Sequence, residues 1–150
     1  MVNSTENNTT IEIYTDGACL GNPGRGGWAA ILLYKEHQKK ISGSNKETTN
    51  NQMELSAVIE ALKSLKNNHN QLIIYTDSKY VIDGITKWIF NWKKNAWRTA
   101  DRKPVKNYEL WQELDKEVHK HQIKWVWVKG HSGNKYNEMV DQLAREAAAL

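Results

Sequence analysis

The tetrapeptide Ile-Tyr-Thr-Asp occurs twice in this chain, as Ile13–Asp16 and again as Ile74–Asp77. Each copy ends a short apolar and β-branched run, which is the pattern of a β-strand. If the two strands are parallel neighbours about 4.8 Å apart, their final aspartates meet at one edge of the sheet. The alternative is that each aspartate only caps the element that follows it. The matched register of the two copies favours a pair of carboxylates.

The pattern of apolar residues and turn residues predicts the elements on either side of the two copies. A loop over 17–27, with five glycines and Pro23, suits a tight backbone path near a ligand. The expected order is strand 11–15, strand 28–35, a turn at 37–39, strand 40–44, helix 53–65, strand 72–76, a short helix from 78 to about 84, helical spacing over 85–92, helix 107–120, strand 123–128 and helix 137–149. This order predicts an α/β fold, a mixed five-stranded sheet flanked by helices. Ligands are expected beyond the carboxyl ends of its parallel strands.

Length and composition predict one domain over residues 11–150, preceded by a flexible polar tail over 1–10. The single cysteine, Cys19, excludes an intramolecular disulfide and is typical of a reducing compartment. The tail lacks the features of a signal peptide, and no stretch approaches the roughly 20 apolar residues of a membrane span. We expect a cytoplasmic monomer that does not bind membranes.

Positive charge is concentrated in one segment, residues 87–106. It holds seven basic residues and one acid, so its net charge is +6 while the rest of the chain is at −2. Such a concentration predicts a surface that binds a polyanion.

Two further acids lie on otherwise apolar helical faces. Glu54 begins a stripe that continues through Val58 and Ala61. It either interacts with the helix dipole or points at the edge of the two aspartates. Asp141 shares a small-residue face with Ala144, and the alternative is a solvated acid in a first turn. Five other acids are expected on solvated faces: Asp83, Asp101, Asp115, Glu117 and Glu146.

Two adjacent carboxylates repel each other unless one gains a proton or a cation lies between them. Asp16 and Asp77 alone therefore predict a metal site or an acid/base dyad. Four converging carboxylates without a cysteine or histidine cluster form an all-oxygen ligand set, which favours Mg²⁺ or Mn²⁺ over zinc. Together with the basic segment, this set points to phosphodiester chemistry.

Several motifs resemble ribonuclease H of the bacterial type 1 class and occur in order from about Ile11 to Ala149. They are Tyr14-Thr15-Asp16-Gly17, Thr49-Asn50-Asn51-Gln52-Met53-Glu54-Leu55, Tyr75-Thr76-Asp77-Ser78, Val128-Lys129-Gly130-His131-Ser132-Gly133, and then Asn137-Glu138 and Asp141. The resemblance implies a mixed five-stranded sheet flanked by helices and cleavage of the RNA strand of RNA–DNA hybrids. It also implies two Mg²⁺ ions, with Mn²⁺ as a substitute, and products with 3′-hydroxyl and 5′-phosphate ends.

The resemblance also implies roles for single residues. Asp16 would bridge both ions, and Asp141 would help to hold the ion that activates water. Glu54 and Asp77 would hold the ion on the leaving-group side. His131 would assist proton transfer or product release, a role that rests on the resemblance because loop histidines are commonly inert.

Substrate contacts follow from the same resemblance. Thr49 and Asn107 match positions that grip a DNA phosphate. Residues 87–106 resemble a basic protrusion that approaches the DNA strand. For its tryptophans helix packing is the alternative, and we expect both, with Ile85 and Trp88 inward and Trp92 or Trp97 partly exposed. The remaining implied contacts are Trp88, Trp92, Lys93, Lys94 and Trp97 on the protrusion, and Asn22, Asn50 and Asn51 near the minor groove, where 2′-hydroxyls distinguish RNA from DNA.

The chain departs from the family pattern at three places. Gln52 stands where a basic residue is usual, Asp83 where a neutral polar residue is common, and residues 134–136 replace a loop that often carries His or Pro. The pattern has two rival functions. A hybrid-binding module without catalysis predicts that one of the four acids is missing, and none is. A nuclease or strand-transferase acting on DNA is disfavoured by the basic segment and the Thr49–Gln52 string, through the resemblance alone.

Overall fold

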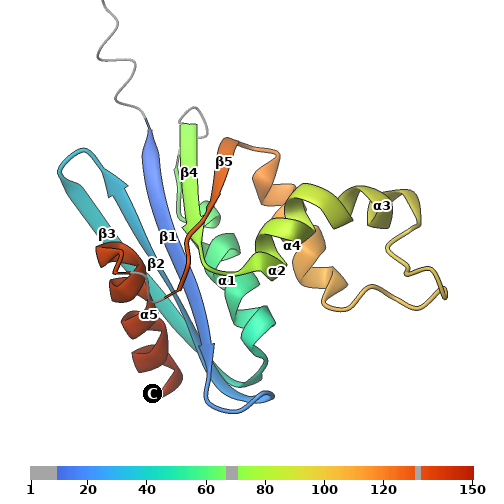
Figure 1. Ribbon diagram of the computed structural model, residues 1–150, viewed down its shortest axis with the longest axis horizontal. Coiled ribbons are helices and arrows are strands. Elements are labelled where there is room, and N and C mark those ends of the chain that lie inside the picture. Colours follow the sequence, from blue (N-terminus) through green and yellow to red (C-terminus); the bar gives the residue numbers. More distant parts are fainter. Residues whose placement is uncertain (1–9, 67–70, 131–132) are drawn as a thin grey trace, which may run out of the picture.

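The computed structural model describes residues 10–66, 71–130 and 133–150 (Figure 1). Its elements in chain order are β1 (Ile11–Cys19), β2 (Gly24–Tyr34), β3 (His37–Thr48), α1 (Asn50–Lys63), β4 (Gln71–Thr76), α2 (Lys79–Asp83), the π-helical segment η2 (Gly84–Trp88), α3 (Ile89–Lys94), α4 (Tyr108–Val118), β5 (Gln122–Trp127) and α5 (Lys135–Ala148). Within these described ranges, no helix combines the length and apolar character needed to cross a membrane.

The strands form one mixed sheet in the order β3-β2-β1-β4-β5. β1, β2 and β3 pair antiparallel, whereas β1, β4 and β5 pair parallel. The predicted fold class, a mixed five-stranded sheet flanked by helices, is therefore confirmed. The carboxyl ends of β1, β4 and β5 lie at one edge, as expected for parallel strands.

Two hydrophobic cores lie on opposite faces of the sheet because successive strand residues point to opposite sides. Ile13 packs with Leu55 and Val58 of α1 on one face, and Tyr14 packs with Val140 of α5 on the other. Figure 1 shows α5 across one face of the sheet, and α3 with the loop beyond it projecting away from the sheet. The projecting part contains the basic segment.

The predicted loop over 17–27 and the predicted turn at 37–39 are wrong. β1 runs to Cys19 and β2 begins at Gly24, so only residues 20–23 connect them. Gly27 lies within β2. A glycine is needed there because α5 packs directly on it, and a Cβ would collide with the backbone of Ala144 and Ala148. The small-residue face of α5 thus allows close approach to the sheet. The hairpin turn lies at 35–36, where Lys35 has a φ of 54°.

α2 ends at Asp83 with Gly84 as its C-cap, as predicted, but the chain does not leave the helical conformation there. The backbone continues through η2 into α3, and Gly84 itself has an ordinary helical φ of −63°. Trp111 explains the glycine, because its fully buried indole ring occupies the space that a Cβ at Gly84 would need. Gly84 therefore marks the end of α2 and also permits the close packing of Trp111.

The acids predicted on solvated faces differ in their exposure to solvent. Asp101 and Glu146 are exposed, as expected. Glu117 is only 6% exposed, so its prediction is wrong. Its side chain accepts hydrogen bonds from Lys120 Nζ at 3.3 Å, which offsets the cost of burying the carboxylate.

Candidate metal centre and nucleic-acid interface

The two Ile-Tyr-Thr-Asp copies lie side by side in register. Ile13 pairs with Ile74 and Tyr14 with Tyr75 across the parallel β1–β4 ladder. The predicted parallel neighbours are therefore present, and Asp16 and Asp77 occupy equivalent positions at the carboxyl edge of the sheet.

Glu54 joins these two aspartates from α1. Each of the three residues offers a carboxylate oxygen, and these oxygens all lie within 4.8 Å of one another. Asp16 is 3% exposed and Glu54 5% exposed. α1 reaches the site because Gly17 lacks a side chain, since a Cβ there would lie 2.5 Å from the Glu54 nitrogen. Of the two alternatives for Glu54, the structure places it against the aspartates.

Asp141 approaches the same group from α5. Its carboxyl group shares a side-chain hydrogen bond with Asp16. It also accepts from Arg145 Nη2 at 3.0 Å, one helical turn further along. Asp141 is half-buried, so it is not the fully solvated acid of the alternative interpretation. The structure thus brings three carboxylates into one close group and sets the fourth beside Asp16.

The electrostatics of the group are unfavourable for three negative charges. Burial, then repulsion by Asp77 and the hydrogen bond with Asp141, raise the pKa of Asp16 to about 8, against the opposing hydrogen bonds with Glu54 and the backbone N–H of Gly17. Burial, and then the charges of Asp16 and Asp77, raises the pKa of Glu54 well above its ordinary value. Glu54 Oε1 is buried without a hydrogen-bond partner in the described part of the chain. An unpartnered buried oxygen in an all-oxygen group fits a divalent cation such as Mg²⁺ or Mn²⁺.

Three residues at this edge were given no role from the sequence, although Asn137 belongs to one of the motifs that carry the resemblance. Asn137 is 2% exposed and lies one turn before Asp141, and its Oδ1 has no partner among the described residues. The spacing of four residues from Asp141 was the signal that could have identified it. Trp127 Nε1 donates to the backbone oxygen of Asp77 at 3.3 Å, and Lys79 Nζ lies 4.6 Å from the centre of the Trp127 ring.

His131 lies outside the described residues, so its predicted role is neither supported nor contradicted by geometry. The preceding residue does approach the site, because a Cβ on Gly130 would lie 3.1 Å from Asp77 Oδ2. After the gap, Asn134 caps α5 by accepting from the Asn137 N–H at 2.9 Å.

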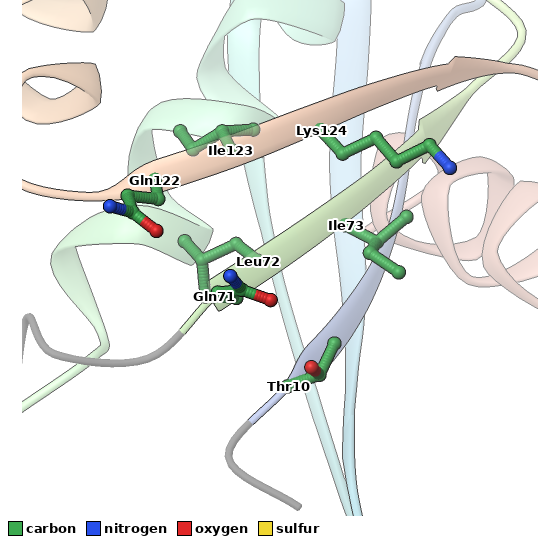
Figure 2. A pocket seen from close by; sticks show the side chains of 7 residues that line it. All are labelled: Thr10, Gln71, Leu72, Ile73, Gln122, Ile123 and Lys124. Atoms are coloured by element: carbon green, nitrogen blue, oxygen red, sulfur yellow. The ribbon is translucent and has the colours of Figure 1, made fainter. Parts of the chain in front are cut away.

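A pocket at the opposite end of the sheet is separate from the carboxylates. Figure 2 shows side chains at the start of β4 and β5, such as Gln71 and Gln122, lining it. The carboxylates follow the ends of the parallel strands. This pocket therefore contributes nothing to the metal centre.

The residues expected to touch nucleic acid near α1 are held by hydrogen bonds. Thr49 is the N-cap of α1, and its hydroxyl accepts from the Gln52 N–H at 3.2 Å. Asn22 Oδ1 accepts from the Asn50 N–H at 3.1 Å, which brings two predicted contact residues together. Asn51 follows in the first turn of α1 and is half-buried. Asn107 begins α4 and accepts from Gln52 Nε2 at 3.1 Å.

The tryptophans of the projecting segment pack around a buried centre. Trp92 and Trp97 are partly exposed and Ile85 is buried, as predicted. Trp88 is 40% exposed, so the prediction that it points inward is wrong. Its ring contacts Tyr80 at 6.0 Å and Trp92 at 5.9 Å between centroids, and so covers the cluster from the solvent side.

Several lysines of the basic segment are already paired with acids of this chain. Lys93 Nζ lies 3.1 Å from Asp115 Oδ2, so Asp115 is a partner of the segment and not a solvated acid. Lys87 pairs with Asp83 at 3.5 Å, so this departure from the family pattern offsets part of the segment's charge. Within the described ranges, Lys94 has no acidic partner within 4.0 Å. The two adjacent lysines are therefore not equivalent.

A close group of carboxylates that could hold a metal ion, together with a projecting segment of net positive charge, is typical of a metal-dependent enzyme that acts on nucleic acid. The RNase H family model matches residues 8–149. A ribonuclease H of Novosphingobium aromaticivorans is 59% identical over 138 residues, which is 92% of this chain and 96% of that protein. A ribonuclease H of Escherichia coli is also 59% identical over 138 residues, 92% of this chain and 88% of its own length.

The chain belongs to the ribonuclease H family and is a metal-dependent endoribonuclease. Among solved structures, LC9-RNase H1, a type 1 RNase H with the type 2 active-site motif, has a TM-score of 0.85 at 33% identity. The match covers 93% of this chain and 72% of that one. The structural likeness extends over nearly all of the chain.

Proposed function

We propose that this chain hydrolyses the RNA strand of RNA–DNA hybrids with two Mg²⁺ ions, for which Mn²⁺ can substitute, and leaves 3′-hydroxyl and 5′-phosphate ends. The observation that carries the proposal is the group of three carboxylates within 4.8 Å, with a buried Glu54 oxygen that has no hydrogen-bond partner among the described residues. Membership of the ribonuclease H family supports the substrate class.

The roles of the four acids follow the family resemblance. Asp16, which interacts with each of the other three acids, would contact both ions. Glu54 and Asp77 would hold one ion, and Asp141 would help to hold the other. When bound, two such ions lower the pKa of the attacking water and offset the negative charge on the leaving O3′. Residue His131 would move a proton or speed product release.

The remaining residues bind the substrate. Thr49 and Asn107 would hold a DNA phosphate, and the exposed amides Asn22 and Asn50 would face the minor groove beside Asn51. The exposed face of the projecting segment would follow the DNA backbone through Trp88, Trp92, Lys93, Lys94 and Trp97. We also propose that the domain over residues 11–150 works as a monomer, with residues 1–10 as a tail.

The experiment is incubation of the purified protein and Mg²⁺ with an RNA–DNA hybrid, a DNA duplex and an RNA duplex, each labelled on one strand. The expected result is cleavage of the RNA strand in the hybrid alone. Ligation of the fragments, which requires a 5′-phosphate and a 3′-hydroxyl, tests the ends. Binding of the hybrid without cleavage would favour a hybrid-binding module, and cleavage of DNA would favour a DNA nuclease or strand-transferase.

A further inference from the structure

Gln52 is hydrogen-bonded at both ends of its side chain. Its Oε1 accepts from the Thr49 N–H at 3.2 Å and from the Thr48 hydroxyl at 2.8 Å. Its Nε2 donates to Asn107 Oδ1 at 3.1 Å, across 55 residues of sequence. The bond from the Thr49 N–H belongs to the capping box of α1, whereas the bond from the Thr48 hydroxyl connects the end of β3 to the same oxygen. The third connects α1 to the start of α4 and has no capping function.

Asn107 is an unusual N-cap residue for α4. Asparagine at this position commonly accepts a bond from the first turn, but the Asn107 side chain makes no such bond in α4. Its backbone has a φ of 62°, a left-handed conformation that asparagine tolerates better than most residues. The amide group therefore points away from its own helix, toward Gln52 and Tyr80.

A second bond fixes the other end of the Asn107 amide. Asn107 Nδ2 donates to the Tyr80 hydroxyl at 3.1 Å, and Trp111 Nε1 donates to the same hydroxyl at 3.0 Å. Trp111 is fully buried, so this branch of the network is anchored in the core. Tyr80 follows Asp77 by three residues, which connects the amide to the segment that carries a carboxylate.

The Thr49 hydroxyl and the Asn107 amide each retain a hydrogen that they can donate to an anion. The Thr49 hydroxyl accepts from the Gln52 N–H through a lone pair, which leaves its own hydrogen. The Asn107 amide has two N–H groups and uses one of them on Tyr80. The amino end of the 14-residue helix α1 adds a favourable dipole for an anion beside Thr49.

We propose that Gln52 is a positioning residue that joins Thr49 and Asn107 into one rigid site for a backbone phosphate of the DNA strand. The proposal rests on the proposed function. Gln52 does not touch the substrate. Its neutral side chain holds the two donors in place through hydrogen bonds, and its backbone N–H and side-chain amide act on different partners at the same time.

The test is a double-mutant cycle on KM and kcat for hybrid cleavage with Gln52→Met and Asn107→Gly. Methionine keeps the length of the side chain and removes its hydrogen bonds, and glycine removes the amide at a position with positive φ. Gln52→Met is expected to raise KM roughly threefold to tenfold, the range for one lost hydrogen bond, with kcat unchanged. In the Asn107→Gly background it is expected to raise KM less than about twofold further.

The matched control is Ser64→Ala, which removes a hydrogen bond to the Ala61 oxygen at the other end of α1. It is expected to lower the melting temperature as Gln52→Met does, but to leave KM unchanged. Independent, multiplicative effects of Gln52→Met and Asn107→Gly on KM would overturn the proposal. So would a KM for Gln52→Met no higher than that of Ser64→Ala.

A second measurement separates this proposal from the proposed function. In the free protein, the Asn107 side-chain NH₂ signals in a ¹⁵N–¹H spectrum are expected to shift in Gln52→Met and to stay in place in Ser64→Ala. If the wild type fails to cleave hybrid, the proposed function fails, and the same cycle is then measured as the Kd of the hybrid. An unshifted Asn107 signal with an unchanged Kd would overturn the role of Gln52 alone.

Discussion

The rings of Tyr14 and Tyr75 stack in parallel across β1 and β4, with 4.3 Å between centroids and 8° between planes. They are the second residues of the two tetrapeptide copies, and the stack lies two residues before Asp16 and Asp77. Tyr75 also donates its hydroxyl to Glu12 Oε2 at 2.6 Å. The pair therefore fixes the register that brings the two carboxylates together, on the face of the sheet that α5 covers.

The first prediction concerns Asp77, one of the three carboxylates of the candidate metal centre. Asp77→Asn is expected to abolish Mg²⁺-dependent cleavage while the fold persists, because the amide removes a negative charge that the ions require. The measurement is single-turnover cleavage of the hybrid, with circular dichroism as the check on folding. Asp101→Asn, at an exposed acid of the projecting segment, is the control and is expected to keep its activity. Turnover near that of the wild type in Asp77→Asn would contradict the two-ion assignment.

The second prediction follows from the raised pKa of Asp16 in the metal-free protein. The folded pKa is about 8 and the ordinary value 3.8, so between these pH values the folded state holds a proton that the unfolded chain has released. Stability is then greatest at the acid end and falls as pH rises from about 4 to about 8. Glu54, whose pKa is also raised, acts in the same direction.

Thermal unfolding in EDTA across this pH range measures the effect. The melting temperature is expected to fall toward pH 8, and Asp16→Asn is expected to flatten the profile and to raise the melting temperature at pH 8. Mg²⁺ added at pH 8 should restore stability to the wild type more than to the variant. A melting temperature of the metal-free wild type that rises toward pH 8 would show that the carboxylates are not mutually repulsive.

Some side-chain positions could be predicted from the sequence and others could not. The strand period and the matched register predict that Asp16 and Asp77 lie side by side, whereas for Glu54 the helical period left two alternatives and only the family resemblance placed it with the aspartates. The exposure of Trp88 was not predictable, because Trp88 lies in the π-helical segment η2, whose turn holds more residues than an α-helical one and so rotates Trp88 away from the expected face. The hydrogen bond between Gln52 and Asn107 could not be predicted either, since it joins residues that only the tertiary fold brings together.

The third prediction concerns His131, which follows β5 and Gly130. His131→Ala is expected to slow turnover by roughly 10²-fold or less, the lower range for assistance to proton transfer, and to leave Mg²⁺ affinity almost unchanged. The measurement is a Mg²⁺ titration of single-turnover rates in both proteins. A large rise in the Mg²⁺ concentration needed for half-maximal rate would instead make the histidine a metal ligand.

The last prediction concerns the two adjacent lysines of the projecting segment. Each phosphate contact is expected to lower the log–log salt slope of hybrid binding by about one unit when it is removed. Lys93 already pairs with Asp115, whereas Lys94 has no acidic partner in the described ranges, so a phosphate that binds Lys93 must compete with that carboxylate. Lys94→Ala is therefore expected to reduce the slope more than Lys93→Ala, and the double variant more than either.

The measurement is KM and kcat over a salt series for the wild type, both single variants and the double variant. Turnover at saturating substrate should change little, because the lysines contribute to ground-state binding away from the carboxylates. Asp115→Asn provides the converse test, since it frees Lys93 and is expected to lower KM at low salt and to increase the slope. If the double variant keeps both the wild-type slope and the wild-type KM, the two lysines form an ordinary solvated face, and hybrid binding depends on other residues.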